Sequence, residues 1–490
     1  MLPSETQTYK RVAALPLPDQ AKVTSNIKYG LIVPPSPFVM PCGWEWAHRA
    51  PFEGPSIIAS LVKGLGYGFR LFDQRAITDP NDLVGKLKSY DVVGVTAYED
   101  NFPYIKAACE IAKQDNPKCI VVMGGPLVTS APELLMNNTV ADYAVLGEGE
   151  LTLTELMDFI SQNEFAKSIE EIKGLAWRNK EGVLVINKER EQMDNLDAVP
   201  FQDFSVWEMY QGKDIPEVFL SYSRGCVCNC AFCYRPMPKL KYKSIDRVKR
   251  ELAFLGKYNF KFAWWNDLTF VTDKEFVHKL LDEAFPAHPH RWTCFARAVG
   301  VDLPVLKHMK ENGCDLILYG FESISQDVLD CYRKGTTKHA ILNTIHLTRE
   351  SGIKCGGLLI VGAPDETIEM VDNLIEFCKE FKEITRVKYL SILPGTVLYR
   401  QALKDGIIKD ELAHLYWLST EESIEEDIDK PGFINMSQHL TKDQLKYAYH
   451  AVNTMIEQRP YNYELEENVF LDKPIEFKKG KDLEESRKIK

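Results

Sequence analysis

The strongest constraint on the fold is an alternation of short apolar runs and helical patterns, repeated in two series along the 490 residues. Short apolar runs bounded by turn residues predict buried strands, and apolar residues recurring every three or four positions predict helices. Strand–helix alternation favours an α/β chain built on parallel sheets. Because 490 residues exceed one ordinary core, we expect two or three domains.

The first series fills residues 27–190 and predicts a doubly wound, Rossmann-like domain. Its expected strands are 29–33, 68–72, 92–97, 119–123 and 143–146, and its expected helices are 57–65, 82–87, 104–112 and 151–160. Sheets of this kind bind ligands beyond the carboxyl ends of their strands. The candidate binding residues in those turns are Thr96, Tyr98, Glu99, Gly124, Gly125, Pro126, Gly147, Glu148, Gly149 and Glu150.

Between the two series, four of the twelve cysteines fall within residues 226–233. Cys226, Cys230 and Cys233 have a Cys-x-x-x-Cys-x-x-Cys spacing, with Phe232 directly before the last of them. Three thiolates on so short a loop can bind three irons of a cubane [4Fe-4S] cluster and leave the fourth iron open to a substrate molecule. The loop therefore predicts a catalytic iron–sulfur site.

Two other uses of the cysteines have weaker support. A structural zinc site usually takes two Cys-x-x-Cys pairs, and no second pair follows the loop. The remaining cysteines are scattered singly, which disfavours a disulfide framework and predicts reduced, mostly buried thiols. Cys228 lies in the loop outside the three-ligand spacing, and the sequence leaves it open as a spare thiol, a ligand or a packing residue.

The run GCVCNCAFC at residues 225–233 resembles the cluster loop of the radical S-adenosylmethionine (SAM) superfamily. The resemblance implies that Cys226, Cys230 and Cys233 are the catalytic and metal-binding residues. It also implies that the open iron binds the amino and carboxylate groups of SAM. Reduction of the cluster would then cleave SAM to a 5′-deoxyadenosyl radical.

The second series, residues 217–398, follows an expected linker at 191–216 and is similar to the six-unit partial barrel of that superfamily. Its expected strands are 218–222, 260–265, 292–296, 316–319, 356–361 and 387–393. In strand–helix barrels the chemistry gathers at the carboxyl ends of the strands. By resemblance, the SAM-binding residues at those ends are Phe232, Asp267, Arg297, Gly320, Glu322, Ser323, Gly362 and Pro394. Among these, Arg297 would pair with the SAM carboxylate, and Glu322 would accept from its amino group or ribose.

The first series is similar to the cobalamin-binding domain that precedes the cluster loop in one large subgroup of the superfamily. The resemblance rests on the order and spacing of the runs VGVTAYEDN, GGPLVTSAPELL and VLGEGELTLTEL. The Asp-x-His-x-x-Gly motif that supplies a histidine to cobalt elsewhere is absent, and Leu127 stands where related domains often have histidine. The lower face of cobalt is therefore expected to be open or to receive another group, for which Tyr98 is the candidate; ordinary packing on the sheet is the alternative for this tyrosine.

Charge and hydropathy limit the setting of the protein. The net charge of −11 disfavours nonspecific nucleic-acid binding, and the basic residues between positions 239 and 250 predict a solvated face. No apolar run approaches the roughly 20 residues of a membrane helix, and no signal-type segment begins the chain, so we expect a cytoplasmic protein without a membrane span. Residues 1–26 are expected to form an extension, and residues 399–490 a mainly helical region with a charged, frayed tail.

The combination predicts a cobalamin-dependent radical SAM methyltransferase in an anaerobic cell. By the family interpretation, cob(I)alamin takes a methyl group from one SAM, a second SAM is cleaved at the cluster, and the substrate radical takes the methyl group from methylcobalamin. A flavodoxin- or ferredoxin-type electron donor is implied. The favoured substrate is an unactivated carbon of a peptide or protein side chain, such as a glutamine or arginine of methyl-coenzyme M reductase, with a small molecule as the alternative.

Two alternative functions remain open. An enzyme with both cofactors could close rings, as in anaerobic magnesium-protoporphyrin ester cyclisation, or rearrange carbon skeletons. Only methylation should couple S-adenosylhomocysteine to turnover. A non-enzymatic iron–sulfur or cobalamin sensor is the third class, and the set of SAM-type residues argues against it.

Overall fold

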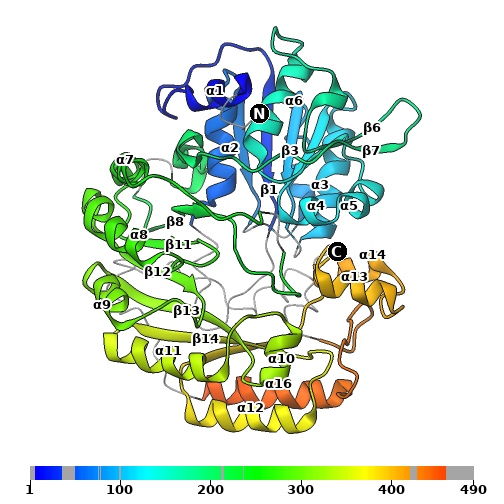
Figure 1. The fold of residues 1–490 in the computed structure, drawn as a ribbon. Coiled ribbons are helices and arrows are strands. Elements are labelled where there is room, and N and C mark those ends of the chain that lie inside the picture. The colour runs from blue at the N-terminus through cyan, green and yellow to red at the C-terminus, as the bar shows by residue number, and fades with distance from the viewer. Residues whose placement is uncertain are drawn as a thin grey trace.

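The computed structural model describes residues 6–35, 50–75, 77, 79–98, 101–210, 214–234, 237–419 and 427–458. Two α/β units make up most of it (Figure 1). The upper unit comes from the first part of the chain and the lower unit from the second. The expected α/β class, with one sheet for each predicted series, is confirmed.

The upper sheet has seven strands in the order β2-β1-β3-β4-β5-β6-β7. Its parallel strands are β1 (Lys28–Val33), β2 (Gly68–Asp73), β3 (Val92–Thr96), β4 (Ile120–Gly124) and β5 (Tyr143–Val145). Two unpredicted antiparallel strands, β6 (Leu175–Arg178) and β7 (Leu184–Ile186), extend it. The helices of this unit are α1 (Gln7–Ala13), α2 (Glu53–Gly64), α3 (Phe102–Asp115), α4 (Pro126–Ser130), α5 (Pro132–Asn138) and α6 (Gly149–Ser161).

One helix of the upper unit was predicted wrongly. The segment 82–87 forms the short 3-10 helix η3 (Pro80–Leu83) followed by turns. Gly85 adopts a φ of +81° there, a left-handed conformation that a right-handed helix cannot contain. The apolar residues have helical spacing, but the backbone conformation at Gly85 ends the helix after a single turn.

The lower sheet has six parallel strands in the order β15-β14-β13-β12-β11-β8, which follows the order along the chain. Such one-way winding produces a partial barrel with β8 and β15 at its edges. Its strands are β8 (Glu217–Leu220), β11 (Phe262–Trp265), β12 (Arg291–Ala296), β13 (Cys314–Glu322), β14 (Lys354–Val361) and β15 (Ile384–Tyr389). Its helices are α7 (Ile245–Leu255), α8 (Lys274–Lys279), α9 (Leu303–Glu311), α10 (Gln326–Cys331), α11 (Lys338–Ser351) and α12 (Ile368–Glu380).

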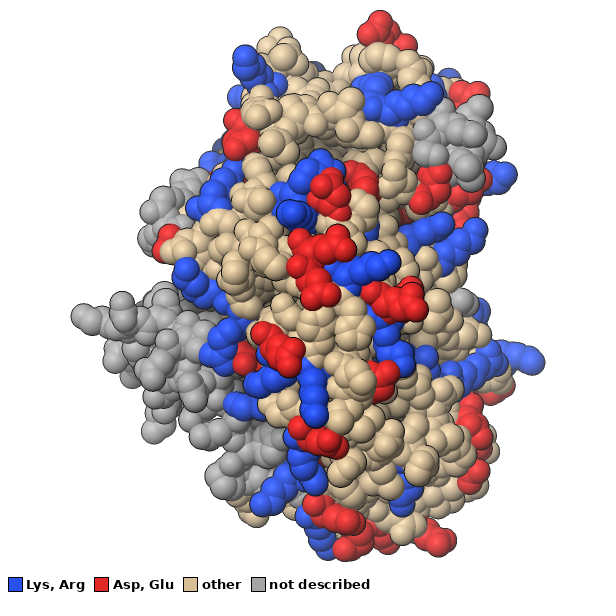
Figure 2. Space-filling view, turned by 60° about the vertical axis from the view of Figure 1, so that its left-hand side comes forward, with Lys and Arg blue, Asp and Glu red and all other residues tan. Residues whose placement is uncertain are grey.

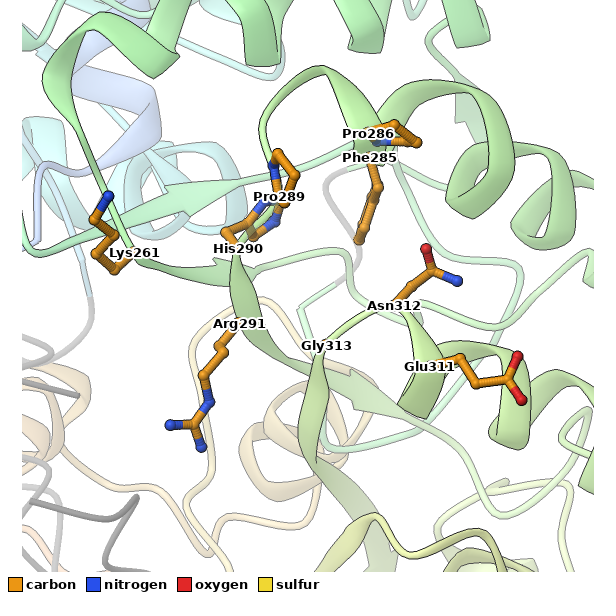
Figure 3. Close-up of a pocket in the computed structure, with 9 residues that line it drawn as sticks. All are labelled: Lys261, Phe285, Pro286, Pro289, His290, Arg291, Glu311, Asn312 and Gly313. Atoms are coloured by element: carbon orange, nitrogen blue, oxygen red, sulfur yellow. The ribbon is translucent and has the colours of Figure 1, made fainter. Parts of the chain in front are cut away.

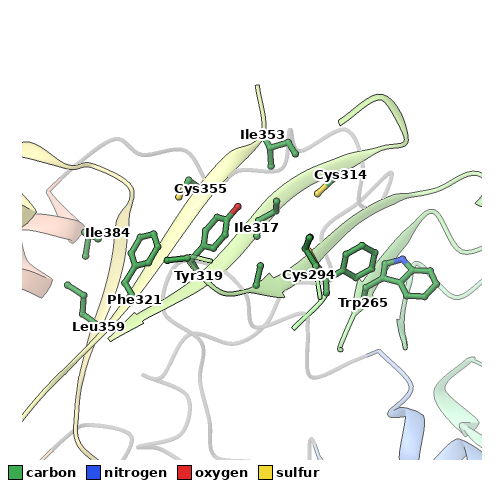
Figure 4. Close-up of a cluster of buried hydrophobic side chains, with 14 of the residues drawn as sticks. Trp265, Cys294, Cys314, Ile317, Tyr319, Phe321, Ile353, Cys355, Leu359 and Ile384 are labelled. Carbon is green, nitrogen blue, oxygen red and sulfur yellow. The ribbon is translucent and has the colours of Figure 1, made fainter. Parts of the chain in front are cut away.

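The core of the barrel contains buried side chains of both its strands and its helices, and Figure 4 shows the strand residues of this cluster side by side along the sheet. Successive strand residues enter different clusters because side chains alternate across a sheet. On β13, Ile317 and Tyr319 join the large outer cluster, whereas Leu316 and Leu318 join a small inner one with Trp264. The sheet thus carries apolar residues on both faces, as expected for a parallel sheet.

The end of the described chain is helical, as predicted, and packs on both units. Its helices are α13 (Val397–Lys404), α14 (Glu411–Leu418) and α16 (Lys442–Glu457). The α16 helix packs on α12 and β15. The ring of Tyr416 on α14 lies 5.3 Å from that of Phe102 on α3, and Leu415 belongs to the core of the upper unit. The charged tail at 478–490 and the acidic run at 421–426 lie outside the described residues.

The predicted linker is more ordered in structure than its sequence indicated. Residues 191–216 contain three short 3-10 helices, η5 (Leu196–Ala198), η6 (Phe204–Val206) and η7 (Glu208–Tyr210). Trp207 is fully buried, and its Nε1 donates to Ser56 Oγ at 2.9 Å. The segment therefore packs against the upper unit.

Each helix that the structure describes is too short or too polar to cross a bilayer.

Candidate active site

The cysteine loop begins and ends at a two-strand ladder, in which β9 (Ser223–Arg224) pairs antiparallel with β10 (Lys241–Tyr242). Gly225 has a φ of +91°, and a Cβ there would lie well under 3.0 Å from the carbonyl oxygen of Lys239. Only glycine permits so close an approach with this backbone conformation. The Cys226 N–H donates to Met237 O at 3.2 Å. The base of the loop is therefore narrow and defined.

The middle of the loop is attached to the barrel and to α13. The Ala231 N–H donates to Tyr332 O at 2.9 Å, and Ala231 O accepts from the Leu398 N–H at 3.0 Å. The ring of Phe232 lies edge-on to that of Tyr332, with 5.1 Å between centroids. The sequence-predicted aromatic residue thus packs against the segment that follows α10.

Charged groups surround the predicted cluster ligands. A hydrogen bond from Cys228 and the nearby charge of Arg297 lower the pKa of Cys226 to about 6. Burial raises the pKa of Cys230, and the cations Lys334 and Arg297 oppose that rise. Positive charge close to a thiol favours the thiolate, which is the form that binds iron. The thiolate is therefore favoured at Cys226, whereas burial raises the pKa of Cys233 to about 12.

The four loop cysteines and the seven others that the structure describes are all free thiols. Six of the seven are buried, and Cys331 is half-buried, in agreement with the expectation of reduced thiols. Cys228 is half-buried, and its N–H donates to Cys226 Sγ at 3.4 Å. Among the described residues no group of His, Cys, Asp and Glu side chains could hold a metal ion. A cubane cluster makes a different demand, because each thiolate binds a different iron.

Glu322 is the last residue of β13. The strand therefore extends into the segment Gly320–Ser323, which was predicted to follow it. Glu322 has a left-handed φ of +61°, and the register with β14 shifts between Gly320 and Glu322. Its Oε1 accepts from Lys334 Nζ at 2.8 Å, and both side chains are about nine-tenths buried. Lys334 was not identified from the sequence. It lies twelve residues beyond Glu322, where no periodic pattern connects the two.

Arg297 follows β12 and has an unused donor. Its Nη2 donates to the backbone oxygens of Lys334 and Gly335. Its Nε is buried and has no hydrogen-bond partner among the described residues. A buried unsatisfied donor is costly, and a carboxylate is the strongest acceptor for a guanidinium. The predicted pairing with the SAM carboxylate is therefore chemically suited to this position.

Asp267, predicted to bind SAM, supports the start of the cysteine loop. Its carboxylate is 1% exposed and accepts from the Tyr222 N–H at 3.1 Å and from the Ser223 N–H at 2.7 Å. The Ser223 hydroxyl also donates to it, at 2.5 Å. Burial raises the pKa of Asp267 to about 7. A direct contact between Asp267 and SAM stays a prediction.

The remaining predicted SAM residues lie in the loops after β13, β14 and β15. Ser323 is buried and its hydroxyl accepts from the Ser325 N–H. The Gly362 N–H donates to Glu366 Oε2 at 2.6 Å, and Leu445 of α16 lies 3.5 Å from the position of a Cβ at Gly362. Pro394 is buried beside Gly395. A Cβ on Gly395 would lie well under 3.0 Å from the Ser130 carbonyl oxygen, so this loop touches α4 of the upper unit.

The predicted cobalamin turns meet at the carboxyl edge of the upper sheet. Thr129 Oγ1 donates to Gly125 O at 2.9 Å and accepts from the Gly147 N–H at 3.0 Å, which links the loops after β4 and β5. Among the described residues, a Cβ at Gly147 would meet no atom within 4 Å, and one at Gly124 only Val145 O at 4.0 Å. Gly125, in contrast, is packed against Ala97. The turns leave open space beside Gly147 and Gly124, as a cradle for a large planar cofactor requires.

The residues after β3 are engaged with their neighbours. The Thr96 hydroxyl donates to Ile32 O at 3.4 Å. The Tyr98 ring packs edge-on against Phe52 at 6.4 Å, so packing accounts for part of its role. Leu127 is fully buried in the core of the upper unit. Glu99 lies outside the described residues.

Glu148 and Glu150, predicted to bind cobalamin, point to the base of the cysteine loop. Arg224 Nη1 lies 3.1 Å from Glu148 Oε1, and its Nη2 lies 2.6 Å from Glu150 Oε1. Burial alone would raise the pKa of Glu150, but the charge of Arg224 brings that pKa below its ordinary value. The two carboxylates raise the pKa of Arg224 further, against its burial. Neither the cysteine spacing nor the glycine-rich turns of the sequence indicated that Arg224 joins the two units.

A second buried charge cluster lies close by and corrects the predicted solvated face. Lys243 and Arg247 are each 1% exposed, and their side chains lie 3.0 and 2.9 Å from the Glu251 carboxylate. Lys243 Nζ also lies 3.6 Å from Glu53 at the start of α2. These cations are therefore buried between the units, whereas Lys239 of the same basic stretch is exposed.

Comparison with known proteins agrees with this geometry. The B12 binding domain model matches residues 54–157, and the Radical SAM superfamily model matches residues 220–378. An uncharacterized methyltransferase of Pyrococcus horikoshii is 30% identical over 67% of this chain and 73% of its own length. The chain belongs to the cobalamin-dependent radical SAM family. Its expected cofactors, a [4Fe-4S] cluster, SAM and cobalamin, and its enzyme class, a radical SAM methyltransferase, are those of the family.

Other members are more distant. The anaerobic magnesium-protoporphyrin IX monomethyl ester cyclase of Rubrivivax gelatinosus is 25% identical over 69% of this chain and 64% of its own. The radical SAM methyltransferase TsrM of Kitasatospora setae, solved with cobalamin and a [4Fe-4S] cluster, superposes with a TM-score of 0.62 at 17% identity over 77% of this chain and 78% of its own. The radical SAM enzyme OxsB superposes with a TM-score of 0.60 at 17% identity over 84% and 58%. These likenesses show a shared fold.

A cavity of about 610 Å³ lies away from this radical SAM site. Figure 3 shows Lys261, His290, Arg291 and Gly313 among its lining residues. These residues stand at the amino ends of β11, β12 and β13, whereas the cysteine loop follows the carboxyl end of β8. In barrels of this kind, the amino ends of the strands serve stability rather than chemistry. We assign the cavity no part in the reaction.

The surface of this radical SAM enzyme carries both charge signs side by side on the face in Figure 2. Exposed ion pairs such as Lys274–Asp302 and Arg250–Asp246 illustrate this mixing elsewhere in the described chain. Such pairs contribute little stability, about 0–1 kcal/mol each. The charges that organise the molecule are the buried ones between its two units.

Proposed function

We propose that the protein is a cobalamin-dependent radical SAM C-methyltransferase that transfers a methyl group to an unactivated carbon. The observation that carries the proposal is the direct contact between the two predicted cofactor loops, made by Arg224 with Glu148 and Glu150. Radical formation and methyl delivery must reach one substrate carbon, so the two sites have to face each other. The methyltransferases among the relatives support the same reaction.

Cys226, Cys230 and Cys233 are proposed to hold the cluster, on a loop attached to Gly225, Tyr332 and Leu398. When bound, the cluster with SAM would supply a carbon-centred radical that removes hydrogen, and cobalamin would supply the methyl group. The protein side chains bind the cofactors and orient them toward the substrate. They provide geometry and charge rather than acid–base chemistry.

Arg297 and Glu322 are proposed to bind the two ends of the amino-acid part of SAM. Arg297 Nε, which has no hydrogen-bond partner within the described ranges, would donate to the carboxylate. Glu322 would accept from the amino group, and Lys334, whose Nζ lies 2.8 Å from Glu322 Oε1, would hold its carboxylate in place. Gly362 and Pro394 would shape the nucleoside part of the pocket. Ser323, Phe232 and Asp267 are proposed to complete the SAM site, and they contact Ser325, Tyr332 and the Tyr222–Ser223 backbone respectively.

The turns containing Gly124, Gly125, Pro126 and Gly147 are proposed to cradle cobalamin, with Gly147 and Gly124 facing open space. Tyr98 is the proposed neighbour of the lower cobalt face. Leu127, which stands where related domains often have histidine, is fully buried in the apolar core, and its side chain carries no nitrogen ligand.

For the substrate we propose a peptide or protein side chain, such as a glutamine or arginine of methyl-coenzyme M reductase, in the cytoplasm of an anaerobic cell. Electrons would come from a flavodoxin- or ferredoxin-type donor. The test is mass spectrometry of peptides from a host with and without the gene. Peptides that lose the mass of one CH₂ group in the deletion strain would support a protein substrate, and a changed small metabolite with an unchanged peptide set would exclude it.

The reaction itself is tested with anaerobically purified protein, reconstituted with iron, sulfide and hydroxocobalamin and then reduced with SAM. We expect S-adenosylhomocysteine and 5′-deoxyadenosine together, and no 5′-deoxyadenosine from Cys230→Ala. The matched control is Cys331→Ala, a half-buried free thiol outside the loop. Substrate turnover with 5′-deoxyadenosine but without S-adenosylhomocysteine would contradict methyl transfer and favour ring closure or rearrangement.

A further inference from the structure

Arg224 occupies a position shared by both cofactor sites. It directly precedes Gly225 and Cys226 in the chain, and its side chain crosses to the amino end of α6 in the upper unit. There its two terminal nitrogens bind different carboxylates, those of Glu148 and Glu150. The three side chains are only 14%, 6% and 5% exposed. This is a buried, forked ion pair between the two units.

Stability alone does not explain such an arrangement. Desolvation of three charges offsets much of the attraction between them, and buried ion pairs are often no more stabilising than apolar residues of similar volume. Two carboxylates share one cation here, and Glu150 Oε2 is buried without a hydrogen-bond partner in the described chain. The fork of a guanidinium does, however, fix two partners in direction as well as distance. The Arg224 guanidinium therefore serves mainly to fix the positions of the Glu148 and Glu150 carboxylates.

The contacts continue on either side of Arg224. On the upper side, Glu148 follows Gly147, whose N–H donates to Thr129, and Thr129 donates to Gly125. Glu148 Oε2 also accepts from the Met193 N–H at 2.6 Å, which fixes its carboxylate. The proposed cobalamin turns are thereby connected to Arg224 through these hydrogen bonds and the backbone between Gly147 and Glu148.

On the lower side, the residues around Arg224 are held by the barrel and the cysteine loop. Asp267 binds Tyr222 and Ser223, directly before Arg224. Gly225 and Cys226, directly after it, are held against the returning strand of the loop. A ligand that fixes Cys226 therefore fixes the backbone from which the Arg224 side chain extends.

We infer that Arg224 is a positioning residue that couples the two cofactor sites, so that loading of the cluster strengthens cobalamin binding. An ordered cysteine loop holds the guanidinium in place, and the guanidinium holds Glu148, Glu150 and the adjacent Gly147 turn in the form that receives cobalamin. By linkage, bound cobalamin stabilises the cluster site by the same factor. The coupling goes beyond the proposed methyl transfer and does not depend on the substrate.

The experiment is an anaerobic absorbance titration of the full chain with hydroxocobalamin, in cluster-loaded and iron-free forms. We expect the cluster-loaded wild type to bind more tightly by about 5- to 150-fold, the usual range of coupling between two sites. Arg224→Met should bind cobalamin with the same affinity in both forms. Glu150→Gln, which keeps the shape of the side chain, should reduce the ratio if Arg224→Met fails to fold.

The matched control is Arg11→Met. Arg11 makes a two-pronged ion pair with Asp158, at 2.6 and 3.1 Å, on the same helix α6 but at its other end. Its loss should leave the ratio of affinities unchanged. Equal affinities in the two forms of the wild type would overturn the inference, as would a ratio that persists in Arg224→Met and Glu150→Gln or disappears in Arg11→Met.

This result is separable from the proposed function. Equal affinities in a protein that still makes S-adenosylhomocysteine and 5′-deoxyadenosine would refute the coupling alone. Coupled binding without S-adenosylhomocysteine would refute methyl transfer alone.

Discussion

Gly395 provides a direct test of how the two units meet. It has a φ of +83°, and a Cβ there would clash with the backbone oxygen of Ser130 on α4. Because that oxygen belongs to the backbone, no side-chain movement relieves the clash. Gly395→Ala must therefore displace either the loop after β15 or the end of α4, the helix that follows the Gly124–Pro126 turn.

Gly406 separates the two costs of the substitution. It has a φ of +67°, and a Cβ there would meet no atom of the described chain within 4 Å. Gly406→Ala should lose only the conformational term, about 1–2 kcal/mol for an L-residue in the left-handed region. Gly395→Ala should lose this and a further 1–3 kcal/mol or so, the usual cost of inserting a methyl group into a packed site.

The assay is thermal unfolding of the iron-free protein, with cobalamin retention as a second measurement. Each kcal/mol lowers the Tm by about 2–4 °C for a cooperative unit of 150–250 residues. We therefore expect Gly395→Ala to melt several degrees below Gly406→Ala and to retain less hydroxocobalamin. Equal losses of Tm in the two variants would refute the close contact between Gly395 and Ser130.

Three further predictions concern single residues of the site. Burial raises the pKa of Glu366 to about 7, above about 4.3 in the unfolded chain, so the wild type loses stability as pH rises through this interval. Glu366→Gln should gain Tm relative to wild type between about pH 5 and pH 8, and a pH-independent difference would contradict the shift. Lys334→Met leaves the buried Glu322 carboxylate unpaired, at a cost of about 3–5 kcal/mol. Adding Glu322→Gln should restore the Tm but not the SAM affinity measured by equilibrium dialysis. Restored SAM binding in the double variant would rule out a role for the pair. Tyr98→Phe should alter the electron paramagnetic resonance spectrum of bound cob(II)alamin, whereas nitrogen splitting in the wild type would identify a nitrogen ligand on the lower face and exclude Tyr98.

The parallel strands were predictable because burial on both faces makes them continuous apolar runs. The expected strands 29–33 and 356–361 lie within β1 and β14. The β6–β7 hairpin gave no comparable signal, because Leu184–Ile186 is three residues long and lies at the sheet edge. The short helices α4 and α5 each begin with proline after a turn, and neither is long enough to show periodicity.

Prediction of the site succeeded for local motifs and failed for contacts made across the fold. The cysteine spacing and the order of glycine-rich turns can be recognised in the sequence alone. Lys334 and Arg224 cannot, since their carboxylate partners are brought to them by the folding of other segments. The same reason explains why Lys243, predicted to be solvated, is buried against Glu251.

The packing of the last helices on both units has a consequence for synthesis of the protein. Leu415 belongs to the core of the upper unit, and Leu445 and Val452 belong to that of the barrel. At about 5–20 residues per second, a ribosome takes roughly 10–50 s to proceed from the end of α6 to Leu415. Throughout that interval, the nascent upper unit exposes the apolar surface around Phe102. Expression of the amino-terminal half alone should therefore yield an aggregation-prone product.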